Sequence, residues 1–125
     1  MDTHALIWWL ADDPSLPNAA RKAIRARSNT ILVSAASAWE VATKFRIGKL
    51  PLGGELSLHF DEILAQELFQ SLPITSVHAA RAGLLPGPHR DPFDRMLIAQ
   101  SHAENLPIIS ADPVFDEYKL RRLWD

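Results

Sequence analysis

Hydrophobic and polar residues alternate in blocks along the chain: short apolar runs are separated by longer stretches in which apolar residues recur at helical spacing. The short runs predict strands at residues 30–33, 70–74, 107–110 and 120–124. The longer stretches predict helices over residues 3–10, 16–27, 58–69 and 92–104, and two more that end near residues 47 and 84. Helices that alternate with buried strands favour a parallel sheet with helices on both faces. We therefore predict a three-layer α/β fold in a single domain over residues 1–125.

Short polar side chains mark where several of these helices begin. Ser34 or Ser37 is expected to cap the helix that ends near residue 47, and Thr75 or Ser76 the helix that ends near residue 84, because these side chains accept hydrogen bonds from free backbone N–H groups. Asp91 stands directly ahead of a proline, which is a favoured first helical residue. It is therefore expected to cap the helix over residues 92–104.

Composition narrows the possible chemistry. The chain holds 13 Lys and Arg residues against 15 Asp and Glu residues, a net charge of −2, so a local site rather than bulk charge would have to bind any nucleic acid. It has no cysteine, which excludes a disulfide scaffold, a thiol nucleophile and a Cys-ligated zinc or iron–sulfur centre. No apolar run reaches the roughly 18 residues of a membrane span, and no secretion signal is visible. We expect a cytoplasmic protein that does not bind membranes.

Acidic residues stand at strand ends and helix starts. Glu40 lies two turns beyond the first predicted strand, Asp112 follows the strand over residues 107–110, Asp91 and Asp94 begin a helix, and Asp2 precedes another. Sites in parallel sheets form outside the carboxyl ends of the strands, so we expect these carboxylates to converge. Two carboxylates about 4 Å apart repel by about 4 kcal/mol at an effective dielectric of about 20. A hard cation such as Mg²⁺ or Mn²⁺ would offset this repulsion, bind a phosphodiester and activate a water.

A second interpretation of the same residues stays open. Taken singly, Asp2, Asp91 and Asp94 stand where an aspartate more often caps a helix or meets its dipole than binds a metal. Glu40 is different, because its apolar neighbours make a poor place for a solvated charge. The five histidines show no zinc-ligand spacing, and the chain has no Gly-rich phosphate loop and no nucleophile elbow.

Four segments in a fixed order carry a resemblance to a known family. They read Asp-Thr-His-Ala-Leu-Ile-Trp-Trp-Leu at residues 2–10, Ser-Ala-Ala-Ser-Ala-Trp-Glu at 34–40, His-Arg-Asp-Pro-Phe-Asp-Arg-Met-Leu-Ile-Ala-Gln at 89–100 and Ile-Ser-Ala-Asp-Pro-Val-Phe at 109–115. Any one segment is a weak signal, but four in order are a strong one. Over nearly its whole length the chain resembles PIN-domain ribonucleases, in particular the VapC-type toxins of bacterial toxin–antitoxin pairs.

The resemblance implies a site and a reaction. The residues that would bind Mg²⁺ or Mn²⁺ and carry catalysis are Asp2, Glu40, Asp94 and Asp112. Residues that would line this centre outside the metal ligands are Asp91, Thr3 and Ser110. Basic residues near the motifs that could contact RNA are Lys44, Arg46, Arg90 and Arg95, although a solvated charge or a salt bridge is an equal expectation for each. The implied reaction is hydrolysis of RNA phosphodiester bonds by a metal-activated water.

The resemblance also implies partners: an RNA substrate, a cognate antitoxin protein that covers an apolar surface, and a second copy of the chain in a homodimer. The apolar residues that we expect to be exposed for such contacts are Trp8, Trp9, Phe45 and Ile47.

One departure from the family concerns the first strand. Members normally carry a short apolar strand ahead of the first aspartate, at the centre of the sheet, whereas only Met1 precedes Asp2 here. We expect a gap in the sheet and an Asp2 that hangs on a mobile terminus. About five apolar residues added ahead of Met1 are expected to raise both stability and activity.

Three alternatives to a toxin remain. The chain could be a PIN nuclease for RNA processing or for DNA, or a PIN-like binding module whose site is impaired by the missing strand. A live metal site should be stabilised by millimolar Mn²⁺, whereas an impaired one should not. A receiver-like phosphotransfer domain is the least favoured, because Lys119 does not follow a predicted strand.

Overall fold

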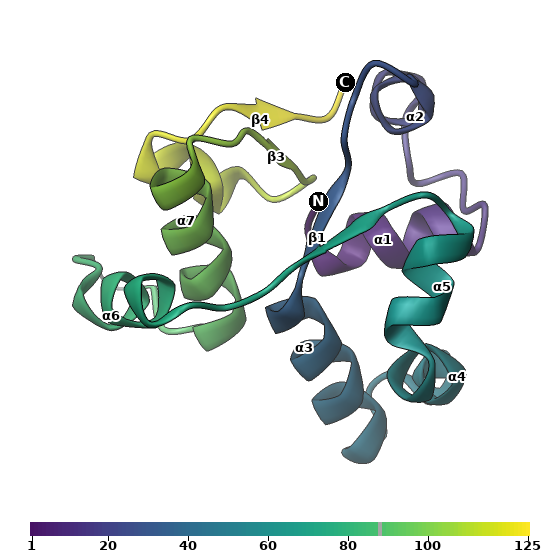
Figure 1. Ribbon diagram of the computed structural model, residues 1–125, viewed down its shortest axis with the longest axis horizontal. Coiled ribbons are helices and arrows are strands. Elements are labelled where there is room, and N and C mark those ends of the chain that lie inside the picture. Colours follow the sequence, from purple (N-terminus) through teal and green to yellow (C-terminus); the bar gives the residue numbers. More distant parts are fainter. Residues whose placement is uncertain (88) are drawn as a thin grey trace.

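The computed structural model describes residues 1–87 and 89–125 (Figure 1). Its α-helices are α1 (Thr3–Leu10), α2 (Asn18–Arg25), α3 (Ala35–Arg46), α4 (Gly54–Leu58), α5 (Phe60–Gln66), α6 (Ser76–Leu84) and α7 (Pro92–Glu104). Its strands are β1 (Leu32–Ser34), β2 (Gln70–Leu72), β3 (Ile108–Ile109) and β4 (Arg122–Leu123), and two 3₁₀-helices are η1 (Pro51–Gly53) and η2 (Pro113–Tyr118). The fold is mixed α/β and mostly helical, in agreement with the predicted three-layer class.

The elements follow the sequence pattern, with differences at their ends. All four predicted strands are present but are only two or three residues long. The helix predicted over residues 58–69 is present as the shorter α5, whereas α4 was not predicted; His59 leaves the helical backbone (φ −127°, ψ 34°) and separates the two. Ser34, Thr75 and Asp91 are the caps of α3, α6 and α7, which settles the choices left open at the first two of these helices.

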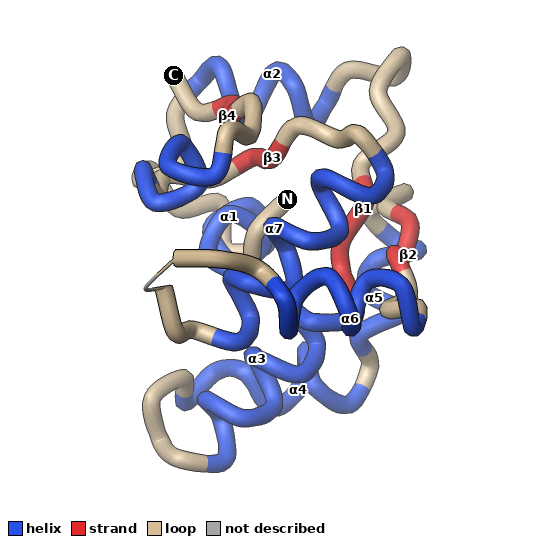
Figure 2. Tube along the Cα trace, turned by 90° about the vertical axis from the view of Figure 1, so that its left-hand side faces the viewer, coloured by secondary structure: helices blue, strands red, loops and turns tan. Residues whose placement is uncertain are grey.

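The strands form two separate pairs, which Figure 2 shows in red, and both pairs are parallel. β1 pairs with β2 in a register that places Leu32 opposite Gln70, and β3 pairs with β4 with Ile108 opposite Arg122. β1 and β3 are not hydrogen-bonded to each other. The expected gap in the sheet is therefore confirmed, and it lies between these two strands.

The first two residues bridge that gap. The Met1 ammonium group donates to the Leu32 carbonyl of β1 at 3.1 Å, and the Asp2 N–H donates to the Ile109 carbonyl of β3 at 3.0 Å. Asp2 is only 7% exposed. The prediction that Asp2 hangs on a mobile terminus is wrong, because backbone bonds to both strand pairs hold this end of the chain inside the fold.

Apolar side chains gather in two clusters, and the larger one spans the gap because it includes Ile109 of β3 as well as Val33 of β1. The larger cluster packs α1, α2 and α5 against β1, with Leu6, Val33 and Leu64 fully buried. The smaller cluster packs α7 and η2 against β3 around Ile98 and Phe115. Within the described residues, no helix is long and apolar enough to cross a membrane.

The tryptophans of α1 are not the exposed pair that the sequence predicts. The Trp8 ring lies 5.7 Å from the Trp124 ring, and the Trp9 ring lies 6.0 Å from that of Phe69. Trp9 also donates its indole N–H to Glu67 at 2.8 Å. Both tryptophans pack against the larger cluster, because the faces of α1 that carry them are covered by the C-terminal segment and by α5 with the residues that follow it. Phe45 and Ile47 are exposed, as predicted.

Candidate active site

Asp2 is the buried carboxylate at the point where the two strand pairs meet. One of its oxygens accepts the Ala5 N–H at 2.9 Å and caps α1, and the other accepts the Ser110 hydroxyl at 2.5 Å. Burial raises the pKa of the Asp2 carboxyl above its ordinary value, although the hydrogen bonds from Ser110 and Ala5 oppose the rise. Asp2 therefore caps a helix, as the second interpretation predicts, and its carboxylate is poorly solvated, while its role as a metal ligand stays a prediction.

Ser110 connects Asp2 to Asp112. Its hydroxyl oxygen accepts the Asp112 N–H at 3.0 Å while it donates to Asp2. The Asp112 side chain is exposed and caps η2 by accepting the Val114 N–H at 2.9 Å. Arg122 of β4 donates to the Ser110 carbonyl at 3.2 Å and so fixes the turn that follows β3.

Glu40 reaches the same region from α3. Thr3 on α1 donates to Ser37 on α3 at 2.9 Å, and both side chains are buried, so the two helices are held together one turn before Glu40. Glu40 is 5% exposed and forms an ion pair with Lys44, four residues further along the same helix. Its charge is therefore balanced within α3.

Asp94 stands in the first turn of α7, opposite α3. Its Oδ2 lies 2.9 Å from Nε2 of His89. Partial burial raises the pKa of the Asp94 carboxyl, the hydrogen bond from His89 opposes the rise, and the charges of Asp91 and Glu40 add to it. The contact between α3 and α7 places Glu40 and Asp94 on neighbouring helices.

Asp91 caps α7, as its place ahead of a proline predicts. Its Oδ1 accepts the N–H groups of Phe93 at 2.9 Å and of Asp94 at 3.1 Å. The Phe93 ring lies edge-on to the Trp39 ring of α3, with the ring centres 4.6 Å apart. Asp91 thus fixes the start of α7, on which Asp94 stands.

The four predicted metal ligands form two pairs in this structure. Ser110 joins Asp2 to Asp112, and α3 and α7 bring Glu40 towards Asp94. Across residues 1–87 and 89–125, no group of three or more His, Asp or Glu side chains is close enough to hold an ion. The carboxylate donors have the chemistry that Mg²⁺ or Mn²⁺ prefers, but the side chains would have to turn towards one another before an ion could bind.

Internal partners hold the buried carboxylates in that arrangement. Lys44 pairs with Glu40, His89 with Asp94, and Ser110 with Asp2. Neither His89 nor Lys44 was predicted from the sequence as a partner of these acids. The spacing could have suggested both, because Lys44 stands four residues after Glu40 on one helix face and His89 shares a short motif with Asp94.

The four basic candidates have different surroundings. Arg95 donates to the carbonyls of Ala82 at 2.8 Å, Leu85 at 2.6 Å and His89 at 2.9 Å, so it holds the connection between α6 and α7. Lys44 is taken up by Glu40. The other two candidates are exposed, and they are Arg46 and Arg90. Arg90 lines a shallow hollow beside His89.

Comparison with known families now gives the class of protein. The PIN domain description matches residues 1–120, and the chain belongs to the PIN domain family. PIN domains are typically nucleases that use divalent metal ions. Searches of curated proteins and of solved structures found no match.

Proposed function

We propose that this PIN domain is a metal-dependent endoribonuclease and the toxin of a VapBC-type toxin–antitoxin pair. The observation that carries the proposal is the pairing of carboxylates at the carboxyl ends of β1 and β3. Ser110 ties Asp112 to Asp2 there, while α3 and α7, which carry Glu40 and Asp94, pack against each other. Asp2 and Glu40 are almost fully buried, and a buried carboxylate is costly without a compensating cation, which supports an ion-binding role.

Four carboxylates would hold Mg²⁺ or Mn²⁺, and these are Asp2, Glu40, Asp94 and Asp112. The bound ion would supply an activated water and charge stabilisation for phosphodiester hydrolysis. The chain's own residues prepare the site: Ser110 orients the Asp2 carboxylate, and the Thr3–Ser37 hydrogen bond holds α1 against α3. Lys44 pairs with Glu40, and His89 lies within hydrogen-bond distance of Asp94; a bound ion would replace both partners.

The RNA phosphates would meet basic side chains at the rim of this site. Arg90 is exposed beside the His89–Asp94 pair, and Arg46 is exposed at the end of α3. Contacts of this kind position a nucleic acid without reading its sequence. The guanidinium group of Arg95 already donates to backbone carbonyls and is not free to bind RNA. Arg95 would therefore contribute by holding the loop that carries His89 and Arg90.

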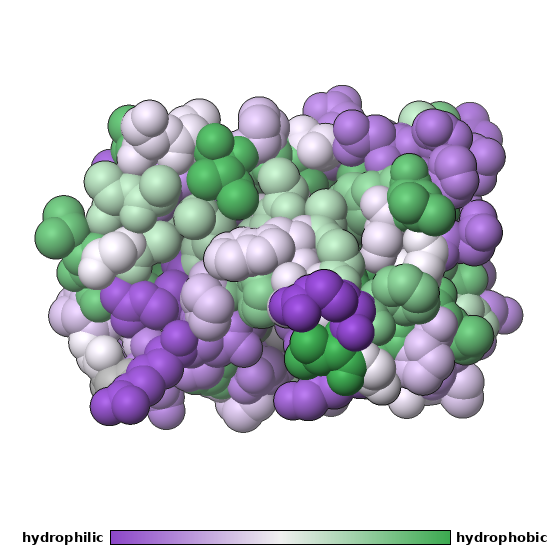
Figure 3. Space-filling model, turned by 90° about the horizontal axis from the view of Figure 1, so that it is seen from below, coloured by the Kyte–Doolittle hydropathy of each residue, from purple (hydrophilic) through white to green (hydrophobic). Residues whose placement is uncertain are grey.

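The antitoxin would cover an apolar surface at the end of α3. Leu52 is 92% exposed and Leu58 is 77% exposed, and both line a hollow with Phe45. We call these three residues the α3–α4 patch. Figure 3 views the molecule from the side on which α3 and α4 lie and shows several apolar areas among polar ones. Exposed apolar clusters of this kind mark contact sites for other chains, so the patch is suited to an antitoxin or to a second copy.

The first experiment is cleavage of total RNA by the purified protein, free of antitoxin, with Mg²⁺ or Mn²⁺ and with EDTA. Asp94→Asn is the test variant, and Asp61→Asn on the exposed face of α5 is its matched control. We expect discrete fragments that vanish with EDTA and in Asp94→Asn but persist in Asp61→Asn. Cleavage that survives EDTA would contradict a metal-dependent site, and cleavage that survives in Asp94→Asn would remove this residue from it.

The toxin role needs its own test. Leu52→Asp is expected to abolish co-purification with the product of the adjacent antitoxin gene, whereas Leu68→Asp, at an equally exposed leucine that follows α5, should leave it unchanged. Equal recovery of the antitoxin with both variants would show that it binds elsewhere.

A binding module with an impaired site is the second candidate, because no three acidic side chains gather among the described residues. Thermal unfolding separates it from the nuclease. Binding of Mn²⁺ to the folded state alone raises the melting temperature, so a live site predicts a rise that is lost in Asp94→Asn. An unchanged melting temperature together with absent cleavage would favour the binding module.

A further inference from the structure

Trp39 on α3 is open to solvent, unlike the other tryptophans. It is 53% exposed, whereas Trp8, Trp9 and Trp124 are partly buried and pack against the larger apolar cluster. Tryptophan is highly buried on average in folded proteins, because its large apolar ring gains much when water is excluded. An indole ring that stays exposed is therefore a candidate contact for a molecule outside this chain.

Phe93 on α7 holds the Trp39 ring in place. The two ring centres lie 4.6 Å apart and the ring planes are 73° from parallel, which is an edge-to-face contact. Contacts of this kind favour one relative orientation of the rings, and this one lies where α3 packs against α7. We call Trp39 and Phe93 the aromatic pair. A pair that served only to join the two helices would be covered by its neighbours, yet about half of Trp39 meets solvent.

The aromatic pair lies at the rim of the carboxylate site. Trp39 directly precedes Glu40 on α3, and Phe93 directly precedes Asp94 on α7. Successive side chains of a helix diverge by about 100°, so each ring stands beside its carboxylate and does not cover it. A ligand whose phosphate met the carboxylates would therefore have its neighbouring groups within reach of the rings.

A basic side chain continues this surface along α3. Arg46 follows Trp39 by seven positions, close to two helical turns, so the two side chains share one face of the helix. They are about 10 Å apart along the helix axis, at about 1.5 Å per residue, and Arg46 is exposed. The face thus offers an aromatic ring and a cation, which are the two kinds of group that bind single-stranded nucleic acids.

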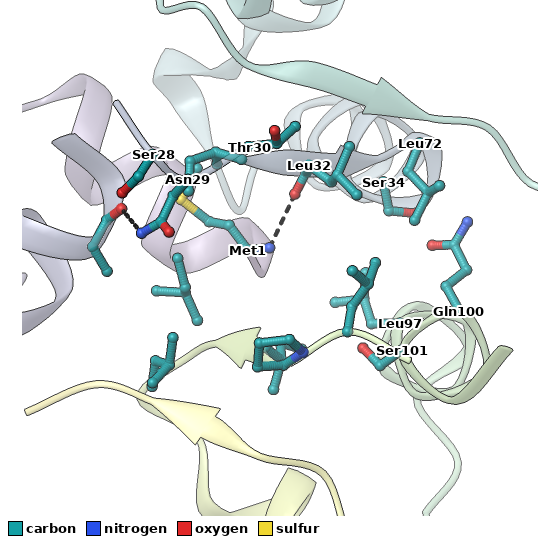
Figure 4. A pocket seen from close by; sticks show the side chains of 17 residues that line it. Met1, Ser28, Asn29, Thr30, Leu32, Ser34, Leu72, Leu97, Gln100 and Ser101 are labelled. Carbon is teal, nitrogen blue, oxygen red and sulfur yellow. Dashed lines mark hydrogen bonds between the residues drawn. The ribbon is translucent and has the colours of Figure 1, made fainter. Parts of the chain in front are cut away.

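The cavity between β1 and β3 offers no such surface (Figure 4). It has a volume of about 250 Å³, and α7 lines it with Leu97, Gln100 and Ser101, which come after the turn that carries Phe93. Among the described residues that line it, no side chain is aromatic or charged. A nucleobase would find no ring to stack on there, so the aromatic pair is the better place for one.

We propose that the aromatic pair is a stacking site for an unpaired nucleobase next to the phosphodiester held at the carboxylates. The inference rests on the proposed function, because it adds a base-binding site to the proposed nuclease centre. Every base has a π face, so stacking on a ring tolerates any sequence. A base inside a duplex is stacked between its neighbours and has to be flipped out before a side chain can reach its face. The pair would therefore favour unpaired RNA over a duplex.

The test measures binding of a fluorescently labelled single-stranded RNA of about 12 nucleotides. Binding is measured in EDTA and in Ca²⁺, a cation that carboxylates bind readily, and gel electrophoresis checks that the RNA stays whole. Trp39→Leu removes the ring but keeps an apolar side chain against Phe93, and Trp39→Phe keeps a ring. Val77→Ala is the matched control, because Val77 on α6 is 58% exposed. The same RNA annealed to its complement is the duplex control.

Trp39→Leu is expected to raise the dissociation constant for single-stranded RNA by about fivefold or more, as the loss of one stacked base does. Trp39→Phe should keep most of the affinity, because a phenyl ring also stacks, and Val77→Ala should bind as the wild type does. The duplex should bind equally well to Trp39→Leu and to the wild type. Single-stranded RNA should also quench the indole fluorescence of the wild type more than that of Trp39→Phe, because a stacked base quenches indole emission.

Three results would overturn the proposal. The first is an affinity of Trp39→Leu for single-stranded RNA equal to that of the wild type, or no binding by the wild type in either condition. The second is an equal loss in Trp39→Phe and Trp39→Leu, which would make Trp39 a structural residue. The third is a loss of co-purification with the antitoxin in Trp39→Leu while RNA binding is kept, which would make the pair a protein contact.

Failure of this proposal can be told apart from failure of the proposed function. RNA that is bound through Trp39 but is not cut with Mg²⁺ or Mn²⁺ would contradict the nuclease and support the stacking site. RNA that Trp39→Leu and the wild type cut with the same KM would support the nuclease and overturn the stacking site.

Discussion

The Ser110 hydroxyl donates to the Asp2 carboxylate across 108 positions of sequence. The bond joins the first residues of the chain to the turn after β3, and the same hydroxyl accepts the backbone N–H of Asp112. The candidate site and the bridge between the two strand pairs are thus one structure. A change at Asp2 should affect both stability and metal binding, and in opposite directions.

Asp2→Asn tests this opposition. Asparagine is as good a helix cap as aspartate, and the substitution removes a buried charge whose cost is visible in the raised pKa of Asp2. We expect the free energy of unfolding at neutral pH to stay equal or to rise by about 0.5–2 kcal/mol, as when strain at a functional site is relieved. RNA cleavage and stabilisation by Mn²⁺ should both be lost.

Chemical denaturation of Asp2→Asn beside Asp13→Asn, which changes an aspartate in the turn after α1, gives the comparison. If Asp2→Asn lowers the free energy of unfolding by more than Asp13→Asn does, the ionised carboxylate of Asp2 supports the fold. In that case the acidic centre would be structural at this position.

Lys44→Met tests whether Glu40 needs a counter-charge. Glu40 is almost fully buried and Lys44 is its ion-pair partner, so removal of the ammonium group leaves a poorly solvated carboxylate. We expect a loss of about 1–3 kcal/mol of stability, less than for a fully buried pair because Lys44 is partly exposed. Lys49→Met, at an exposed lysine, should cost little.

Metal ions should reverse this loss if Glu40 is a ligand. The rise in melting temperature on addition of Mn²⁺ should be larger for Lys44→Met than for the wild type, because the ion no longer competes with the ammonium group. An equal rise in both proteins would argue that the ion binds away from Glu40.

The Asp116–Arg122 pair gives a pH dependence. Arg122 donates to both oxygens of Asp116, at 3.0 and 3.2 Å, and this holds the pKa of Asp116 below its ordinary value. A carboxyl with a lowered pKa stabilises the folded state above its unfolded pKa, and this contribution disappears as the pH falls through the folded pKa. Asp116→Asn should therefore be slightly less stable than the wild type at pH 7 and equally stable near pH 2.

Melting temperatures measured from pH 7 down to pH 2 check the sign. We expect the melting temperatures of the wild type and of Asp116→Asn to converge at low pH. The result bears on the candidate site because Arg122 also donates to the Ser110 carbonyl. A constant difference at every pH would mean that Asp116 acts through something other than its charge.

Much of the fold can be predicted from the sequence because its signals are local. The β-branched run ahead of Ser34, the proline after Asp91 and the short polar caps each fix an element through neighbours in the chain. The short helix α4 (Gly54–Leu58) was not predicted, because five residues are too few to show a helical repeat of apolar positions. The packing of Trp8 against Trp124 depends on a contact between the two ends of the chain, which no local pattern encodes.

The contacts of the candidate site could not be predicted from the sequence. Acids at strand ends and helix starts make Asp2, Glu40, Asp94 and Asp112 the candidates, and their role in the site stays a prediction. The partner of a carboxylate depends on where side chains lie in space. His89, for example, reaches Asp94 from a loop that Arg95 holds in place. Arg95 itself looked like a surface cation, and only the three-dimensional structure shows its carbonyl partners.

Arg95 and Arg90 should therefore separate structure from substrate binding. Arg95→Lys loses the planar fork that reaches the carbonyls of Ala82 and Leu85, because an ammonium group is a single compact donor site. We expect a loss of about 1 kcal/mol of stability, because the carbonyls that lose a donor are partly buried. Cleavage should fall mainly through kcat, since the loop that carries His89 loses its fixed position.

Arg90→Ala should leave the melting temperature unchanged and raise KM for RNA, with a weaker salt dependence of binding. Unfolding and cleavage kinetics of the two variants, measured side by side, decide the assignment. A normal melting temperature with a raised KM in Arg95→Lys would place Arg95 among the RNA contacts instead.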